Sequence, residues 1–175
     1  SKKNPSKDLF YAMSHGVNRA TLKKGKDDSR IHFLNKLIKK LDNIDCNFYG
    51  FQNKEPIWGN DFYQALNNSK MGLNLSRGLP TKYYTSNRIA SLMGNGLLTF
   101  IDKKTQLDDM FNKNEAIMYS SINDLTDKIN FYKKNDNLRR KIGSAGRAKY
   151  FKLFSELKIS NYVINKSLGK KSILY

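Results

Sequence analysis

The chain has 175 residues and a formal net charge of +17, from 32 lysines and arginines against 15 aspartates and glutamates. A hydrophobic content of 39% and an aromatic content of 12% fit a globular domain and exclude a disordered chain. No apolar run approaches the roughly 20 residues that span a bilayer. Cys46 is the single cysteine, which excludes an intrachain disulfide and favours a buried thiol in a reducing, cytoplasmic compartment.

The positive charge leaves several partners open, namely nucleic acid, anionic lipid headgroups or a polyphosphorylated ligand. The lysines are scattered along the chain rather than gathered in one block, and some of them, such as Lys36, Lys39 and Lys40, fall on the outer side of an expected helix. A solvated surface therefore explains much of the charge as well as a ligand does.

Apolar runs that are typical of buried strands alternate with amphipathic helical patterns. After a polar leader or expression remnant at 1–7, strands are expected at 9–14, 44–49, 71–76, 97–101 and 116–119. Between them, helices are expected to start at Ser29, to cover 60–68, and to start at Ser86 or Asn87, with a short helical turn at 107–111.

The rest of the chain is predicted to be helical. Asn123 is expected to cap one helix, Asp136 or Asn137 a second, and 155–168 forms a third. Strands that alternate with helices predict a parallel sheet covered on both faces, which is a Rossmann-like α/β fold. The expected domain covers 8–154, and 155–175 forms a C-terminal helix and tail.

Ligands of such sheets bind beyond the carboxyl ends of the strands. That rule selects 15–19, 50–58, 77–88 and 102–105. The residues expected to bind the ligand are Gly16, Asn18, Arg19, Gly50, Trp58, Arg77, Lys82, Tyr83, Tyr84, Ser86, Asn87 and Arg88.

Arg88 is the most unusual of these residues, because a helix dipole disfavours a cation in the first turn. A bound anion would resolve the conflict, while a solvated side chain or a pair with Asp102 explains it equally well. Tyr83 and Tyr84 suit stacking on a base or sugar, and half-buried packing is the alternative. Trp58 could flank a base, although a structural role is the preferred interpretation.

Two common phosphate-binding fingerprints, GxGxxG and GxxxxGK[ST], do not occur in the sequence. Without these fingerprints, the sequence gives no motif evidence for NAD binding or ATP hydrolysis. His15 and His32 have no accompanying carboxylate cluster, so neither a metal site nor a cofactor is expected.

Several segments carry a family resemblance over residues 9–154. They are Ser-Lys-Met-Gly-Leu-Asn-Leu at 69–75, Ser86-Asn87-Arg88 followed by Gly-Leu-Leu-Thr-Phe-Ile-Asp at 96–102, the run 107–125 with Glu115 and Tyr119, and 135–147 with its Asn-Asp, Ile-Gly and Gly-Arg pairs. In this order and spacing they resemble the C-terminal, nucleotide-sugar-binding half of group 1 GT-B glycosyltransferases, especially the branch with spore-maturation-type proteins.

The resemblance implies a domain that binds a nucleoside-diphosphate sugar, needs no metal, and transfers the sugar to a glycan, lipid or other acceptor, such as a cell-envelope glycan. It also implies an N-terminal acceptor domain that this chain lacks, so that the isolated domain is expected to be inactive. Many retaining members hold the donor with two glutamates eight positions apart, and Tyr83 and Ser91 stand at those positions here. Ser91 thereby joins the expected donor-binding residues, and no catalytic residue is assigned.

A non-catalytic basic module that binds nucleic acid or an anionic membrane surface is the alternative function. The sequence contains no RRM, helix-turn-helix or OB signature, so nucleic acid ranks below the sugar donor. A peripheral contact of basic helices with the inner face of the membrane is compatible with either function.

Overall fold

The structure, a computed structural model, describes residues 4–14 and 29–172, and its framework is one parallel sheet. The strand order is β2-β1-β3-β4-β5, with β1 at Lys7–Ala12, β2 at Cys46–Tyr49, β3 at Ser69–Asn74, β4 at Leu98–Asp102 and β5 at Ile117–Tyr119. All four neighbouring pairs are parallel. The predicted Rossmann-like α/β class is therefore confirmed.

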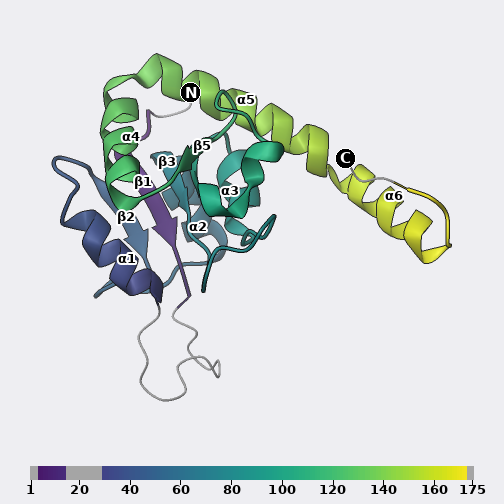
Figure 1. Cartoon of the computed structure of the whole chain (residues 1–175). Helices are drawn as coiled ribbons and strands as arrows, with labels where there is room; N and C mark the ends of the chain where they lie inside the picture. Colours follow the sequence, from purple (N-terminus) through teal and green to yellow (C-terminus); the bar gives the residue numbers. More distant parts are fainter. Residues whose placement is uncertain (1–3, 15–28, 173–175) are drawn as a thin grey trace.

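Helices cover both faces of the sheet (Figure 1). Helices α1 (Ser29–Ile38) and α4 (Ile122–Lys134) pack on one face, while α2 (Gly59–Asn67) and the short α3 (Arg88–Gly94) pack on the other. The long α5 (Asp136–Phe154) crosses the domain, and α6 (Glu156–Ser167) continues from it away from the body. Two 3-10 turns, η2 (Lys103–Thr105) and η3 (Leu107–Asp109), link β4 to β5.

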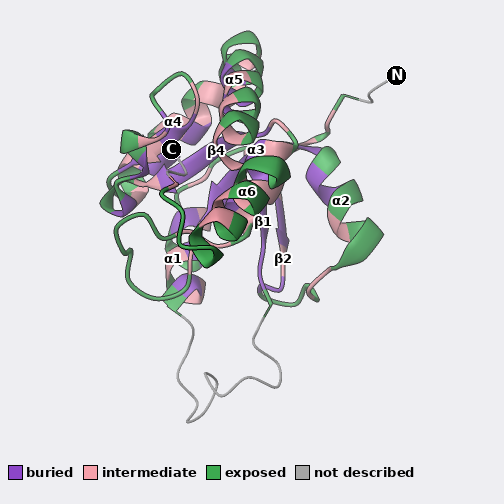
Figure 2. Cartoon of the chain, turned by 90° about the vertical axis from the view of Figure 1, so that its right-hand side faces the viewer, coloured by how far each residue is buried: buried purple, intermediate pink, exposed green. Residues whose placement is uncertain are grey.

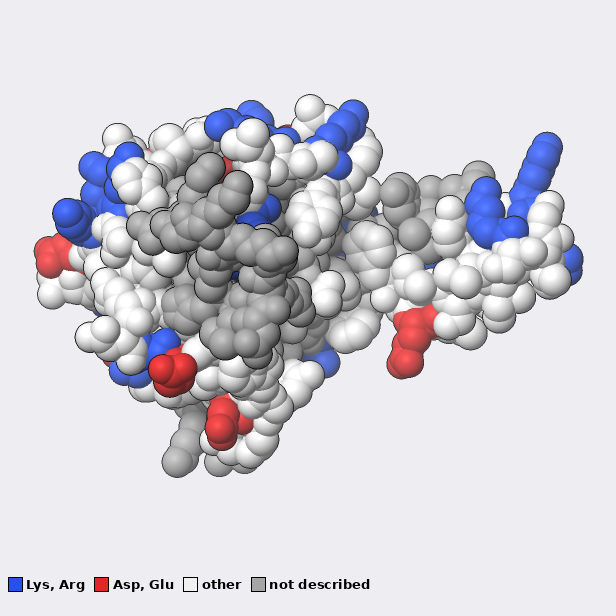
Figure 3. Space-filling view, turned by 90° about the horizontal axis from the view of Figure 1, so that it is seen from below, with Lys and Arg blue, Asp and Glu red and all other residues white. Residues whose placement is uncertain are grey.

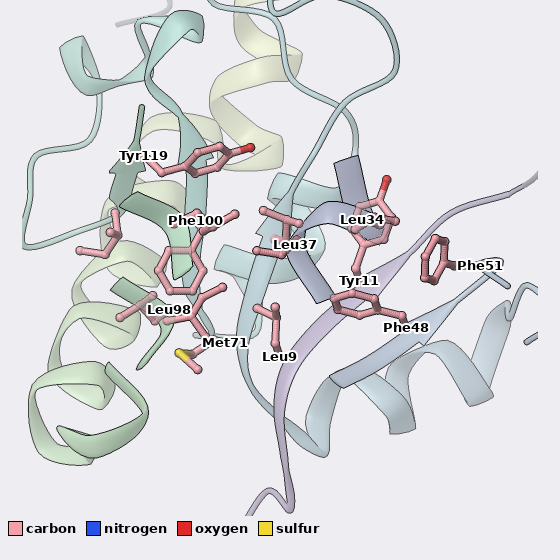
Figure 4. Packing of buried hydrophobic residues seen from close by; sticks show 14 of the residues in the cluster. Leu9, Tyr11, Leu34, Leu37, Phe48, Phe51, Met71, Leu98, Phe100 and Tyr119 are labelled. Carbon is pink, nitrogen blue, oxygen red and sulfur yellow. The ribbon is translucent and has the colours of Figure 1, made fainter. Parts of the chain in front are cut away.

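The larger core lies between the sheet and helices α1 and α4 (Figure 4). Leu9 and Tyr11 of β1, Met71 and Leu73 of β3 and Phe100 of β4 are fully buried there. Because side chains alternate along a strand, the residues between them face α2 and α3. Phe10 packs in this way against Ala65, Leu66 and Leu92. Both faces are apolar, which explains the nearly continuous apolar runs of the strands.

The predicted elements are all present, with ends that differ by a few residues. β1 begins at Lys7, the last residue of the predicted leader. Two predicted caps are wrong. Ser121, not Asn123, caps α4 by accepting a hydrogen bond from the Asp124 amide, and α5 starts after Asn135, whose side chain makes no capping bond.

α5 is one continuous helix despite Gly143 and Gly146. A Cβ at Gly143 would lie 2.3 Å from the Gly96 carbonyl oxygen, and one at Gly146 would lie 2.2 Å from that of Glu115. The glycines thus let the helix backbone touch the backbone of two loops. α6, in contrast, has no buried residue and shows mostly exposed side chains (Figure 2). None of the described helices is long and apolar enough to cross a membrane.

Candidate functional site

A pocket of about 160 Å³ opens where β3 and β4 end. This is the edge of a parallel sheet at which α/β proteins bind their ligands. The pocket is lined by the first turns of α1, the segment after β3, and the end of β4, through Ser29, Arg30, Phe33, Asn74, Leu75, Ser76, Gly78, Pro80, Tyr84, Asp102 and Thr105.

Arg30 supplies a buried positive charge to this pocket, with only 5% of its surface exposed. It lies in the first turn of α1, where the helix dipole is unfavourable to a cation. Asp102, on the other side of the pocket, accepts a hydrogen bond from the Lys104 amide at 2.9 Å and so caps η2. The pocket therefore combines a buried guanidinium with a carboxylate that is held in place.

A chain of polar side chains connects the end of β3 to the start of α3. The buried Asn74 donates to the Thr85 hydroxyl at 2.7 Å and accepts from the Ser86 hydroxyl at 3.4 Å. The Ser86 amide donates to the Ser76 hydroxyl at 3.2 Å. These bonds fix the loop between β3 and α3 against the sheet edge, which holds the pocket wall in one conformation.

Arg88 connects the carboxyl ends of β1 and β3. Its Nε donates to the Ala12 carbonyl at 2.8 Å and its Nη1 to the Leu75 carbonyl at 2.9 Å, and Nη1 also donates to the Ser86 hydroxyl. The guanidinium carbon lies 5.0 Å from the centre of the Tyr11 ring. A cation is thereby held at the centre of the ligand-binding edge.

Tyr83, in the loop after β3, is not among the residues that line the pocket. Its φ of +58° is in the left-handed region, which is unusual for a bulky residue. Its amide donates to the Thr105 carbonyl at 2.7 Å and its hydroxyl to Asp109 at 2.6 Å. Tyr83 thus attaches the loop after β3 to the segment after β4, and Lys82 lies over its ring at 4.8 Å.

Of the other predicted residues in this loop, Tyr84 lines the pocket with 53% of its surface exposed. Arg77 is exposed beside the pocket residues Ser76 and Gly78. Asn87 occupies the N-cap position of α3 without a capping bond from its side chain. Ser91 is half-buried one turn into α3 and accepts through its carbonyl from Asn95.

Gly50 and Trp58 belong to the segment after β2. Gly50 has a φ of +66°, and a Cβ there would lie 1.7 Å from the Met13 carbonyl oxygen. A glycine is therefore required where β1 and β2 end side by side. Trp58 precedes α2 with 68% of its surface exposed. Gly16, Asn18 and Arg19 lie outside the described residues.

Tyr119, at the end of β5, carries a buried hydroxyl without a hydrogen-bond partner among the described residues. Burial raises the pKa of this phenol well above its usual value, and the charges of Asp102 and Tyr11 add to the effect. Its ring centre lies 6.2 Å from that of Phe33, which lines the pocket. Tyr119 therefore stays neutral, and its ring packs near Phe33 in the wall of the pocket.

Sequence reasoning did not single out Arg30, Asn74 or Ser76. Arg30 carries the same signal that identified Arg88, a cation in the first turn of a helix. Asn74 is a polar residue at the end of an apolar strand, and burial hides its role from the sequence. Asp102 and Thr105 fall in a segment that the strand-end rule does select.

Figure 3 views the face of the molecule toward which β1 points in Figure 1. Lysine and arginine side chains are dispersed around this face and along α6 rather than joined in one patch. Among residues 4–14 and 29–172, no three or more His, Cys, Asp or Glu side chains are grouped so as to hold a metal ion. The positively charged residue that lines the pocket is Arg30, and a guanidinium group suits an anionic ligand better than a cation.

The fold and the position of the pocket define an α/β ligand-binding domain. A model of the "Glycosyl transferase-like" family matches residues 30–155, which is more than half of the chain. The chain belongs to this glycosyl transferase-like family.

Among solved structures, the chain is similar to the crystal structure of TarM, with a TM-score of 0.60 and 15% sequence identity. The match covers 93% of this chain and 35% of the TarM chain, so the chain spans about a third of that protein. At this identity the likeness shows the fold, which is the Rossmann-like half of a GT-B architecture. A search of curated proteins found no match.

Proposed function

We propose that this chain is the donor-binding half of a glycosyltransferase, in the branch with spore-maturation-type proteins, and binds a nucleoside-diphosphate sugar at the carboxyl ends of β1, β3 and β4. The observation that carries the proposal is the pocket between α1, the loop after β3 and the end of β4, with the buried Arg30 in its wall. A guanidinium that is held at this edge of the sheet can donate several hydrogen bonds to an anion such as a diphosphate.

The residues of the pocket suit the chemistry of a leaving diphosphate. When the bond between the sugar and the diphosphate breaks, negative charge grows on the phosphate oxygens. Guanidinium groups already held at the site stabilise that charge without rearranging. Arg30 is the group we expect next to the phosphates, while Arg88 adds positive potential from the neighbouring strand ends.

The remaining pocket groups would recognise the sugar or the ribose. Asn74, Ser76 and Thr105 offer amide and hydroxyl groups that both donate and accept hydrogen bonds. Tyr84 offers an exposed ring for stacking on a base or sugar. Tyr83 and Ser91 are not acidic, so a ribose contact of the type made by a glutamate pair would be made by hydroxyl groups instead.

An acceptor-binding domain would complete the enzyme. The apolar side chains of α6 that remain exposed, including Leu157 at 71% and Ile164 at 54%, are the surface on which we expect that domain to dock. The isolated chain would then bind donor without transferring sugar.

Calorimetry and thermal-shift titrations with UDP, GDP, ADP and their sugars test the proposal. We expect one nucleotide series to bind, and Tyr84→Ala to weaken that nucleotide about 5- to 10-fold, which corresponds to about 1 kcal/mol for a lost stacking contact. Tyr63→Ala is the matched control, because Tyr63 is a similarly exposed tyrosine on α2, outside the pocket.

The proposal fails if no nucleotide or nucleotide sugar binds to the chain or to the full-length protein that contains it. An equal loss of affinity in both tyrosine variants would move the binding site away from the pocket.

The net charge of +17 favours one other function, a basic module that binds nucleic acid or anionic membrane without catalysis. That function predicts binding to DNA or to anionic vesicles with a steep dependence on salt and no response to nucleotide sugars. Titrations with DNA, with anionic vesicles and with nucleotide sugars, each in 50 mM and 200 mM salt, separate the two functions.

A further inference from the structure

A second and larger hollow lies beside α2, on the face of the sheet opposite to the one that α1 covers. This groove, of about 1480 Å³, runs between α2 and α5. Its floor includes Ser69 and Lys70, where β3 begins, whereas the pocket is lined by Asn74, where β3 ends. Ser69 and Asn74 are the two ends of β3, about 17 Å apart over five residue steps. The groove also extends to Tyr49, the last residue of β2.

One wall of the groove presents arginines in a row. Arg140, Ser144 and Arg147 lie on the same face of α5 and line the groove. The two arginines are seven residues apart, which places them about 10 Å apart along the helix axis. Asp61 is the one acidic side chain that lines the groove, against five lysines and arginines.

Some of that charge is neutralised by neighbours. Lys70 pairs with Asp8, and Arg139 and Arg140 share Asp136. Arg147 makes no ion pair within the described parts of the chain, and its guanidinium lies 5.7 Å from the Phe151 ring. Lys7 pairs with Asp45. A positive excess remains along α5, because Arg139 and Arg140 share the single Asp136 carboxylate and Arg147 adds a further charge.

Between these cations and α2 the groove offers carboxamides, a hydroxyl and ring faces. Gln64 and Asn67 are exposed on the α2 side, and Ser144 stands between the arginines. Carboxamide and hydroxyl groups donate and accept at once, as the hydroxyls of a sugar require. Tyr49 and Phe151 line the same groove and can cover the apolar face of a sugar ring.

We propose that the groove between α2 and α5 binds an anionic carbohydrate polymer, that is, a chain of sugars bearing carboxylate or phosphate groups. Arginine forks bind such anions in pairs of hydrogen bonds, and the neutral groups bind the hydroxyls. If the proposed transferase function holds, this polymer is the acceptor or its growing product. A polymer held in a groove of the same domain raises the local concentration of its free end at the reaction edge.

Fluorescence anisotropy with labelled oligogalacturonate and with a phosphorylated maltodextrin tests the proposal on the 175-residue chain. The two probes distinguish carboxylate from phosphate recognition. We expect at least one of them to bind, with an affinity that falls as salt rises, and we expect uncharged maltodextrin not to bind. The double variant Arg140→Gln/Arg147→Gln should weaken the bound probe at least 10-fold.

The matched control is Lys36→Gln/Lys39→Gln, which removes one exposed charge from the last turn of α1 and one from the turn that follows it. It should change the affinity less than 2-fold. A second test is Ser144→Glu, which adds an anion between the arginines and should also weaken binding. Ser144 is exposed, so this variant has no reason to unfold.

Three results would overturn the proposal. They are equal losses in the arginine and lysine variants, binding of uncharged maltodextrin as tight as that of the charged probes, and tighter binding of single-stranded DNA, which would make the groove a nucleic-acid site. Nucleotide titrations of the arginine variant report on the pocket separately. A chain that binds the polymer and no nucleotide would refute the proposed donor site alone.

Discussion

At the scale of single residues, two buried tyrosines differ in whether their hydroxyl groups have a hydrogen-bond partner, and this difference affects the stability of the fold. Tyr11 of β1 and Tyr119 of β5 both lie in the larger core and are nearly inaccessible to solvent (Figure 4). The Tyr11 hydroxyl donates to the Leu75 carbonyl at 3.2 Å. The Tyr119 hydroxyl has no partner in the described part of the chain.

We therefore predict opposite effects for the same substitution at the two positions. Tyr119→Phe removes an unpaired buried hydroxyl and should raise the free energy of unfolding by about 1 kcal/mol. Tyr11→Phe removes a hydrogen bond and should lower it by a similar amount, about 1 kcal/mol. Urea denaturation of both variants measures the difference. A loss of stability in Tyr119→Phe would show that this hydroxyl is paired in solution.

At the scale of secondary-structure elements, the contact of α5 with two loops depends on glycine. Gly146 lets the Glu115 carbonyl approach to a position that any side chain would occupy. Gly94, the last residue of α3, has more room, because a Cβ there would meet only the Phe151 ring at 3.9 Å.

Gly146→Ala should therefore destabilise the protein, although alanine is the better helix former. We expect a net loss of about 1–2 kcal/mol, because overpacking exceeds the helix propensity that alanine gains. Gly94→Ala is the control and should be neutral or slightly stabilising. Thermal and urea unfolding of the pair decide between packing and propensity, and equal behaviour of the two variants would contradict the packing explanation.

The same helix shows which features of the elements could be predicted from sequence. Apolar periodicity located every strand and helix, because it records which side chains face the core. Gly143 and Gly146 have low helix propensity, and the sequence alone does not explain them, because the backbone that each one contacts lies in loops some 30 to 50 positions earlier in the chain. The caps of α4 and α5 were misplaced because Ser, Asn and Asp cluster at both helix starts, and only the backbone geometry selects among them.

At the scale of the whole molecule, one buried carboxylate connects four elements or their ends. Asp8 of β1 pairs with Lys70 of β3 at 2.9 Å and with Lys133 of α4 at 2.8 Å, and it accepts from the Asp45 amide before β2. Burial alone would raise the pKa of Asp8, but the hydrogen bonds from Lys133, the Asp45 amide and Lys70 outweigh it, and the pKa lies below its usual value.

A pKa that is lower in the folded than in the unfolded state stabilises the fold above the unfolded value, near 4, and that contribution is lost as the pH falls through the folded value. Asp136, whose pKa its bonds to Arg139 and Arg140 lower to about 2, adds to the same acid loss from a more exposed position. We predict a nearly constant urea midpoint between pH 7 and 5 and a decline below pH 4.

Asp8→Asn should be less stable at pH 7 and should reduce that decline. Asp61→Asn, which alters an exposed carboxylate without an ion pair in the described residues, should leave both unchanged. A decline of full size in Asp8→Asn would assign the acid sensitivity to other carboxylates.

The candidate site could be predicted from sequence only in part, because its geometry depends on how distant parts of the chain pack together. The strand-end rule located the edge of the sheet, and Tyr84 and Ser86 lie there as expected. It could not show that Tyr83 bonds to Asp109, away from the pocket, or that Arg30 from the next layer enters it. Those facts depend on how α1 and the 3-10 turns pack, which is set by contacts between distant parts of the chain.

The glycine contacts of α5 also have a mechanical consequence. The helix has 19 residues and is about 28 Å long, and its middle is pressed against the backbone of two loops. These contacts, together with the packing of Tyr150, Leu153 and Phe154 near its C-terminal end, fix the direction of α5 relative to the sheet. α6 is attached to that end (Figure 1). The point at which α6 leaves the domain, at Ser155, is therefore fixed relative to the pocket, and a partner that binds to α6 would start from that fixed point.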